Sequence, residues 1–303
     1  MKDNLQNNLP AWHYQNLDAL IEMTNDGDGL IPACLLSHLT GYPITDFTDV
    51  KVGIFSTIPF DQRERISVDL SKPKGKGYDN HFTAFSEHTK INHEMINVNN
   101  QKKITGLEEY HDKYGMNTIF LIYAAFKDKI SLPKSEKLLM ILLTFDSAYK
   151  GYYTHRKSFI ENLEFIGLKE ELLPIFEKHT LQDFEELSKR VEAEMPKNFY
   201  LNWNEDEETG ILEFSSDKEV QARAERFLER LSKELGFPIA LPKEQFRRVQ
   251  WLADMGKRSI NKTGDISHDR TLYCYAITSR YSVKSSYLKG HRIDHWRRIC
   301  QFI

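Results

Sequence analysis

Four aspartates stand where an apolar run of the sequence gives way to polar residues. Asp26 and Asp28 follow a first apolar run, Asp69 closes a run with period two, and Asp146 comes directly after residues 138–145. In an open parallel sheet the carboxyl ends of the strands meet at one edge, so we expect these side chains to gather there. Carboxylates that gather repel one another, and a hard divalent cation relieves that repulsion by using their oxygens as ligands. The pattern therefore predicts a metal site.

The polar segment 24–29, Thr-Asn-Asp-Gly-Asp-Gly, has other interpretations. In a calcium loop of the EF-hand type, Asp26 and Asp28 would take the third and fifth positions, but the twelfth is Leu35 instead of the bidentate glutamate. In a phosphatase that uses aspartyl-phosphate chemistry, Asp26 would be the nucleophile and Asp28 the acid or base. Asn, Asp and Gly are also the usual residues of a turn without function.

The other two aspartates have structural alternatives as well. Asp69 lies among apolar neighbours, where a buried carboxylate needs a partner, but an aspartate at the end of a strand also often caps a loop. Asp146 stands in the position of the N-cap of a following turn. The metal interpretation therefore depends on the four aspartates together.

Composition is that of a soluble globular chain. Of the 303 residues, 40% are hydrophobic and 28% are charged, and the formal charge is −3, which argues against disorder and against a DNA-coating protein. No apolar run approaches the roughly 20 residues that span a bilayer, and the first residues lack the apolar core of a signal peptide. The widely spaced cysteines are predicted to be reduced buried thiols: Cys34, Cys274 and Cys300. We expect a cytoplasmic protein without membrane contact.

The expected elements give an α/β fold in two parts. The first half alternates short apolar runs with polar breaks, as β-α units do. Strands are predicted over 17–23, 50–55, 66–70 and 271–281, and helices over 30–36, 118–126, 170–196 and 218–235. With a boundary near residue 155, we expect a parallel-sheet domain over 1–155. A helical linker and a smaller mixed α+β substrate-binding domain follow over 156–303.

The order of the motifs resembles the DHH phosphoesterase superfamily. This group includes single-strand exonucleases, nano-RNases, cyclic-dinucleotide phosphodiesterases and manganese pyrophosphatases. Its first motif, a strand followed by D-x-D-G and a helix, is matched by residues 26–29, and its strand-end Asp by Asp69. The Asp-His-His triplet is matched imperfectly by residues 79–81, Asp-Asn-His, and the Asp after an apolar helix by Asp146. The resemblance covers roughly residues 17–155.

Two imidazoles of the family pattern are missing. Thr24 stands where the family usually has a His, and Asn80 replaces the first His of the triplet. An amide oxygen binds a hard cation, but it is neutral and weaker than an imidazole toward manganese. The glycine-rich motif that the family carries near its end is also absent, and residues 289–292, Lys-Gly-His-Arg, are its nearest relic.

The resemblance implies a DHH-like metal-dependent phosphodiesterase that acts on short single-stranded nucleic acid or small nucleotides, with one or two Mn²⁺ or Mg²⁺ ions. The metal ligands are then Asp26, Asp28, Asp69, Asn80 and Asp146. Asp69, as the bridging ligand, and His81, as a contact to a phosphate oxygen, are the catalytic residues. The substrate-binding residues are His81, Arg280, Lys289, His291 and Arg292, with Tyr281 and Tyr287 placed to stack on bases.

Two further hypotheses follow from the departures. The lost imidazoles at Thr24 and Asn80 favour a weakened relative that binds a nucleotide or nucleic acid without cleaving it. In a structural interaction protein, none of the aspartates would matter for metal affinity.

Overall fold

Three of the four predicted strands are present in the molecule, and the other strands were not predicted. The predicted strands 17–23, 66–70 and 271–281 are confirmed with slightly different ends. In the computed structural model, which describes residues 4–289, the strands are Ala19–Met23 (β1), Ile44–Asp49 (β2), Gly53–Ser56 (β3), Glu64–Val68 (β4), Gly77–Tyr78 (β5), Met95–Ile96 (β6), Tyr200–Asn204 (β7), Thr209–Glu213 (β8), Phe246–Ser259 (β9), Leu272–Ser279 (β10) and Ser282–Leu288 (β11).

The exception is the segment 50–55, predicted as one strand, which spans a hairpin instead. Residues 50–52 form the turn between β2 and β3, and the side chain of Asp49 accepts a backbone hydrogen bond inside it. β2 was not predicted as a strand because it contains polar residues. Two of them, Asp46 and Thr48, are buried on one face of the sheet. The polar residues that alternate along β2 therefore do not face solvent.

The helices agree with the predicted segments 30–36, 118–126 and 218–235. The α-helices are Gly27–Thr40 (α1), Val98–Gln101 (α2), Thr118–Ala125 (α3), Glu136–Thr144 (α4), Lys150–Thr154 (α5), Arg156–Ile166 (α6), Lys169–Lys178 (α7), Leu181–Glu194 (α8), Lys218–Leu235 (α9) and Ile260–Thr263 (α10). Short 3₁₀ turns cover Leu5–Asn8, Ala11–Tyr14, Leu107–Asp112 and Phe145–Ser147.

The segment 170–196, predicted as one long helix, is two helices. Thr180 interrupts it as the N-cap of α8, where its side chain accepts the N–H of Asp183 and the Asp183 carboxylate accepts the N–H of Thr180. This reciprocal capping box satisfies N–H groups that a continuous helix would not leave free, so it defines a new helix start.

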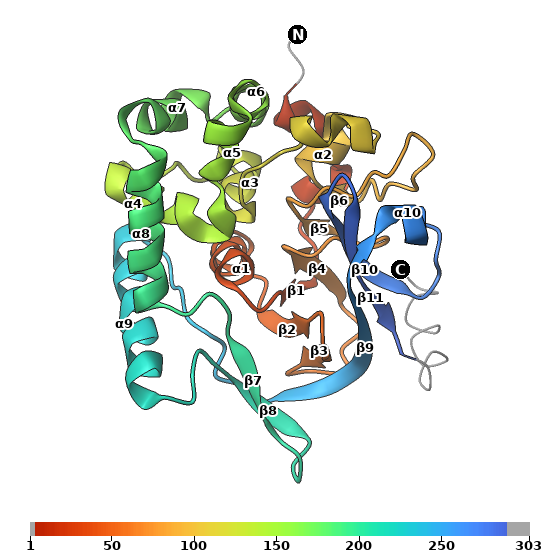
Figure 1. Cartoon of the computed structure of the whole chain (residues 1–303). Helices are drawn as coiled ribbons and strands as arrows, with labels where there is room; N and C mark the ends of the chain where they lie inside the picture. Colours follow the sequence, from red (N-terminus) through yellow and green to blue (C-terminus); the bar gives the residue numbers. More distant parts are fainter. Residues whose placement is uncertain (1–3, 290–303) are drawn as a thin grey trace.

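One mixed sheet connects both halves of the chain (Figure 1). Its strand order is β10-β11-β9-β3-β2-β1-β4-β5-β6, and β2, β1, β4, β5 and β6 run parallel to their neighbours. β3, β9, β11 and β10 continue it in antiparallel pairings. The fold class is therefore α/β, as the sequence predicts. Because β9 pairs with β3 and one hydrophobic core contains residues from Leu5 to Phe246, the division near residue 155 stays a prediction.

The two faces of the sheet are covered differently (Figure 1). The long helices gather on the face that α1 covers, and β10 and β11 curl over the other. That second face contains a buried ion pair between Glu22 of β1 and Lys72, with side chains 2% and 14% exposed. Tyr273 of β10 and Thr48 donate hydrogen bonds to the same carboxylate. Burial raises the pKa of Glu22, but Lys72 and these donors outweigh it and hold that pKa below its usual value.

Among the described residues, no helix is long and apolar enough to span a bilayer. Cys34 and Cys274 are free and buried, as predicted, and Cys300 lies outside the described residues.

We predict that Lys72→Met lowers the free energy of unfolding by about 3–5 kcal/mol, because it leaves the buried Glu22 carboxylate without its cation. The matched control is Lys76→Met, which breaks the more exposed pair with Glu64 and is expected to cost about 1 kcal/mol or less. Urea unfolding at pH 7 measures both values. Equal losses in the two variants would contradict this role for Lys72.

Candidate metal centre

The first turn of α1 begins the site. Asp26 is the N-cap of this helix, and its Oδ1 accepts the N–H of Gly29 at 2.9 Å. The predicted polar turn 24–29 is therefore shorter than expected, because the helix already starts at Gly27. A Cβ on Gly29 would collide with Thr24, so this glycine is required by close packing between the helix end and β1. The helical backbone after Asp26 excludes the EF-hand interpretation.

Asp69 and Asp146 both occupy left-handed backbone conformations. Their φ angles are 59° and 49°, a region that non-glycine residues seldom adopt and that Asp and Asn tolerate best. Asp69 follows β4 directly, and its two oxygens accept hydrogen bonds from the hydroxyls of Thr24 at 3.1 Å and Thr118 at 3.2 Å. Such strained residues persist where the surrounding structure fixes them, and they concentrate at functional sites.

Asn80 connects the remaining aspartates. Its Nδ2 donates to Asp28 Oδ2 at 3.2 Å, to Asp146 Oδ2 at 3.4 Å and to the carbonyl of Met116 at 3.1 Å. Asp28 also accepts the backbone N–H of Thr118 at 3.1 Å. Hydrogen bonds of Thr24, Asn80 and Thr118 thus link the residues that the sequence proposes as metal ligands, which are Asp26, Asp28, Asp69, Asn80 and Asp146. Their role as ligands stays a prediction, because the group with ligand atoms within 4.8 Å of one another among the described residues is Asp69, Asp79 and His81. Thr24 joins Asp26 to the group by a hydroxyl contact of 3.4 Å.

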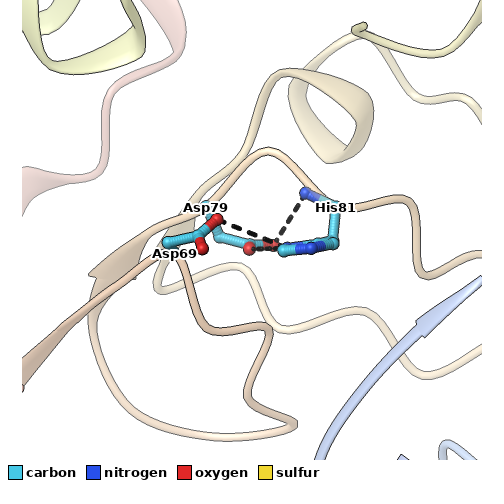
Figure 2. A group of neighbouring side chains, drawn as sticks. All are labelled: Asp69, Asp79 and His81. Atoms are coloured by element: carbon cyan, nitrogen blue, oxygen red, sulfur yellow. Dashed lines mark hydrogen bonds and ion pairs between the residues drawn. The ribbon is translucent and has the colours of Figure 1, made fainter. Parts of the chain in front are cut away.

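A second arm of the site consists of Asp79 and His81 (Figure 2). His81 Nδ1 lies 2.7 Å from Asp79 Oδ1 and 3.8 Å from Asp69 Oδ1. One ligand atom from each of Asp69, Asp79 and His81 lies within 4.8 Å of the others. Asp79 is fully buried, and its Oδ2 accepts hydrogen bonds from Ser71 and from Asn97 Nδ2, the latter at 2.8 Å. It orients the imidazole toward the cluster.

Sequence reasoning did not count Asp79, Asn97 or Thr118 among the site residues. The signal for Asp79 was present, because it directly follows β5 and so ends at the same edge as Asp69. Thr118 had no such signal, since its role depends on the start of α3 packing against α1.

The carboxylates raise one another's pKa values. Burial, and then repulsion by the neighbouring aspartates, raises the pKa of both Asp28 and Asp69 well above the usual range, and burial raises that of Asp26. Burial lowers the pKa of His81, but the carboxylate of Asp79, followed by other aspartates, outweighs it and raises that pKa to about 9. Without a cation, the cluster therefore retains protons.

The donor set fits a hard divalent cation. Carboxylate oxygens of Asp69 and Asp79 lie within 4.8 Å of each other and of a His81 ring nitrogen, oxygen ligands are those that Mg²⁺ and Mn²⁺ prefer, and the paired cysteines typical of structural zinc are absent from the residues described here. The side-chain oxygen of Asn80 is buried and has no hydrogen-bond partner among the described residues. Buried polar atoms are nearly always partnered, so this unpartnered oxygen marks a position that a cation or a water would satisfy.

Comparison with known proteins gave no match. No family model, curated protein or solved structure matches the chain.

A small cavity opens beside the cluster. Asp26, Asp28 and Asp146 line one side, and α8 with the residues after it lines the other, including Ser188 and Lys197. The exposed Lys197 is held near Asp26 because β7 starts beside the segment before α1, where Phe199 N–H donates to the Asn25 carbonyl at 3.0 Å. Lys197 supplies a cation at the mouth of the site that sequence reasoning missed.

The predicted substrate-binding residues of the second half lie elsewhere. Arg280 donates to the backbone carbonyls of Leu107 and Glu108 at 3.1 and 2.9 Å, so its guanidinium holds the β10–β11 turn against a 3₁₀ turn. Lys289 lies beside Trp251 at the end of β11. His291 and Arg292 lie outside the described residues.

We predict that Asp69→Asn abolishes the rise in Tm that Mn²⁺ produces. Asn tolerates the left-handed backbone, and its single side-chain oxygen keeps one of the two hydroxyl hydrogen bonds that the Asp69 oxygens accept, so we expect the fold to be retained. Because the pKa of Asp69 is raised, its stabilising contribution is present below the unfolded pKa and is lost as pH rises through the folded value. The metal-free wild type therefore loses stability toward pH 8 through this group, and the variant does not.

The control for this test is Asp46→Asn. Asp46 is equally buried, but it pairs with Arg65 and lies outside the cluster. It is expected to cost stability and to keep the response to Mn²⁺. Thermal melts at pH 5 and pH 8, with and without Mn²⁺, decide the matter. A full Mn²⁺ response in Asp69→Asn would contradict the metal centre.

Proposed function

We propose that the chain is a divalent-metal-dependent phosphodiesterase of the DHH type that hydrolyses phosphoester bonds of short single-stranded nucleic acid or small nucleotides. The observation that carries the proposal is the convergence of buried carboxylates, an orphaned amide oxygen and an oriented imidazole at the carboxyl edge of the parallel strands. Ligands bind at this edge in open α/β sheets.

The site residues fall into two groups, those that would hold a metal ion and those that position other side chains. Asp26, Asp28, Asp69, Asn80 and Asp146 would hold one or two Mn²⁺ or Mg²⁺ ions. A bound divalent cation supplies an activated water and positive charge opposite a phosphate. Asp79 fixes the orientation of His81 through their 2.7 Å contact.

His81 is the proton-bearing group of the site. Its side chain is 36% exposed, and the carboxylate of Asp79 raises its pKa to about 9 when no cation is bound. An imidazolium held in this way donates a hydrogen bond to a phosphate oxygen and neutralises part of its charge. Lys197, at the mouth of the cavity, adds a second positive charge for a substrate phosphate.

We predict that the wild type with Mn²⁺ converts a 5′-phosphorylated diadenosine dinucleotide to mononucleotides and that Asp69→Asn lowers this rate about a thousandfold or more, because the ion is lost. Chromatography of the products measures the rate, and Asp46→Asn is the control that stays active. Metal-independent cleavage, or equal rates in the wild type and Asp69→Asn, would refute the proposed mechanism.

One observation favours the alternative of binding without cleavage. The Asn80 amide group donates toward both Asp28 and Asp146, and so occupies the place between two carboxylates that a cation would otherwise bridge.

The isosteric variant Asn80→Asp separates the two functions. It replaces the donating amide with a further carboxylate, so we expect a lower Tm without metal and a larger rise in Tm with Mn²⁺ than in the wild type. Melts over a Mn²⁺ titration test this. A lower Tm that Mn²⁺ does not restore would mean that Asn80 is a structural bridge, and would favour the non-cleaving alternative.

A further inference from the structure

An aromatic and cationic group lies on the sheet away from the carboxylates. The guanidinium carbon of Arg248 lies 3.6 Å from the ring centre of Trp251 and 4.4 Å from that of Trp203. The ammonium of Lys289 lies 6.0 Å from the Trp251 ring. We call these four residues the Trp251 platform: Trp203, Arg248, Trp251 and Lys289.

The platform presents an open aromatic surface. Trp251 is 49% exposed, although Arg248 stacks at van der Waals distance on its ring, so a large part of the indole faces solvent. Trp203 is half-buried against the core and supports Arg248 from the other side. The Nε of Arg248 is buried without a hydrogen-bond partner, and neither Arg248 nor Lys289 forms an ion pair within residues 4–289.

The strand register places Trp251 at the same sheet edge as the metal centre. Met23 at the end of β1 pairs with Phe47, Asp49 pairs with Gly53, and Gly53 pairs with Trp251. From β4, which positions Asp69, to β9 there are four strand spacings, or about 19 Å along the sheet. A short oligonucleotide spans that distance.

The platform also lies on the helix-covered face. Arg248 lies 5.9 Å from the Phe55 ring, and Phe55 belongs to the core beneath α1. The site described above also begins at the first turn of α1, so both lie on one side of the sheet at one edge.

We propose that the Trp251 platform stacks a base of a single-stranded nucleic acid whose scissile end reaches the metal centre. This inference rests on the proposed function. It identifies where a base distant from the reacting phosphate would bind. Base stacking on an aromatic ring needs no particular sequence and is worth about 1–3 kcal/mol per base. The Arg248 guanidinium holds the indole plane in place, and Lys289 meets the neighbouring backbone.

Two acidic residues near Arg248 indicate how the platform would contact a nucleic acid. Glu205 and Glu208, at the tip of the β7–β8 hairpin, act on Arg248 electrostatically. They offset its positive charge, so the platform contributes by stacking more than by neutralising phosphates. Its share of the affinity is therefore expected to depend weakly on salt, unlike contacts with phosphates.

Binding can be measured apart from cleavage. The probe is a 3′-fluorescein heptathymidylate, titrated with the full chain carrying Asp69→Asn in the presence of EDTA, so that no hydrolysis occurs. Fluorescence anisotropy gives Kd. Adding Trp251→Ala is expected to raise Kd about tenfold, by a factor that is the same at 50 and 200 mM salt. Trp251→Phe, which keeps a ring, restores most of the affinity.

Matched variants make the outcome decisive. Phe60→Ala removes another exposed aromatic, 77% exposed and outside the platform, and is expected to leave Kd unchanged. Tyr281→Ala tests the rival stacking residue on the β10–β11 turn, which is 69% exposed. An unchanged Kd in Trp251→Ala, a loss in Tyr281→Ala alone, or no binding by the parent protein would each overturn the platform.

The two experiments test the proposed hydrolysis and the Trp251 platform independently of each other. If the wild type does not hydrolyse the dinucleotide but Trp251→Ala weakens heptathymidylate binding, the platform stands and catalysis does not. If hydrolysis is observed and Kd does not depend on Trp251, only the platform is refuted.

Discussion

The repulsion among buried carboxylates is the constraint on which the rest of the structure depends. Asp28, Asp69 and Asp79 are each 6% exposed or less, and isolated buried charges of this kind cost far more than a fold can supply. Each is therefore surrounded by donors. Those donors come from the end of β1, the loop after β4, the start of α2 and the start of α3, so the site exists only when these segments are assembled.

Two buried charge systems lie at β1, one beside the strand and one just after its end. Glu22 points to the face covered by β10 and is neutralised by Lys72 within the fold. Thr24, two residues later, begins the carboxylate cluster, whose described partners include no lysine or arginine side chain in an ion pair. The first system is neutralised within the fold, whereas the carboxylates of the second raise one another's pKa values and retain protons when no cation is bound.

The sequence predicted those parts whose signals are local. Runs of apolar residues located β1, β4, α1 and α3, and the aspartates at their ends assembled because parallel strands end at one edge. Parts that depend on tertiary context were missed. β2 was missed because Asp46 and Thr48 look solvent-facing but are buried, Asp46 beside Arg65 and Thr48 beside Tyr273 of β10. The break before α8 depends on the capping pair at Thr180. Neither Lys197 nor Trp251 has a local signal in the sequence. Lys197 reaches the cavity because the chain before β7 packs against Asn25, and Trp251 reaches the sheet edge because β9 pairs with β3.

The two positions that depart from the resembled family share one physical property. Thr24 donates between Asp26 and Asp69, and the Asn80 amide donates between Asp28 and Asp146, so each places a neutral donor between two carboxylates. Neutral donors reduce the repulsion that would otherwise favour a cation, and an entering ion has to compete with them. A carboxylate still keeps further lone pairs, because each has about four acceptor positions. If the centre binds a divalent cation as proposed, we expect the binding to be weaker than it would be with imidazoles at the same two positions.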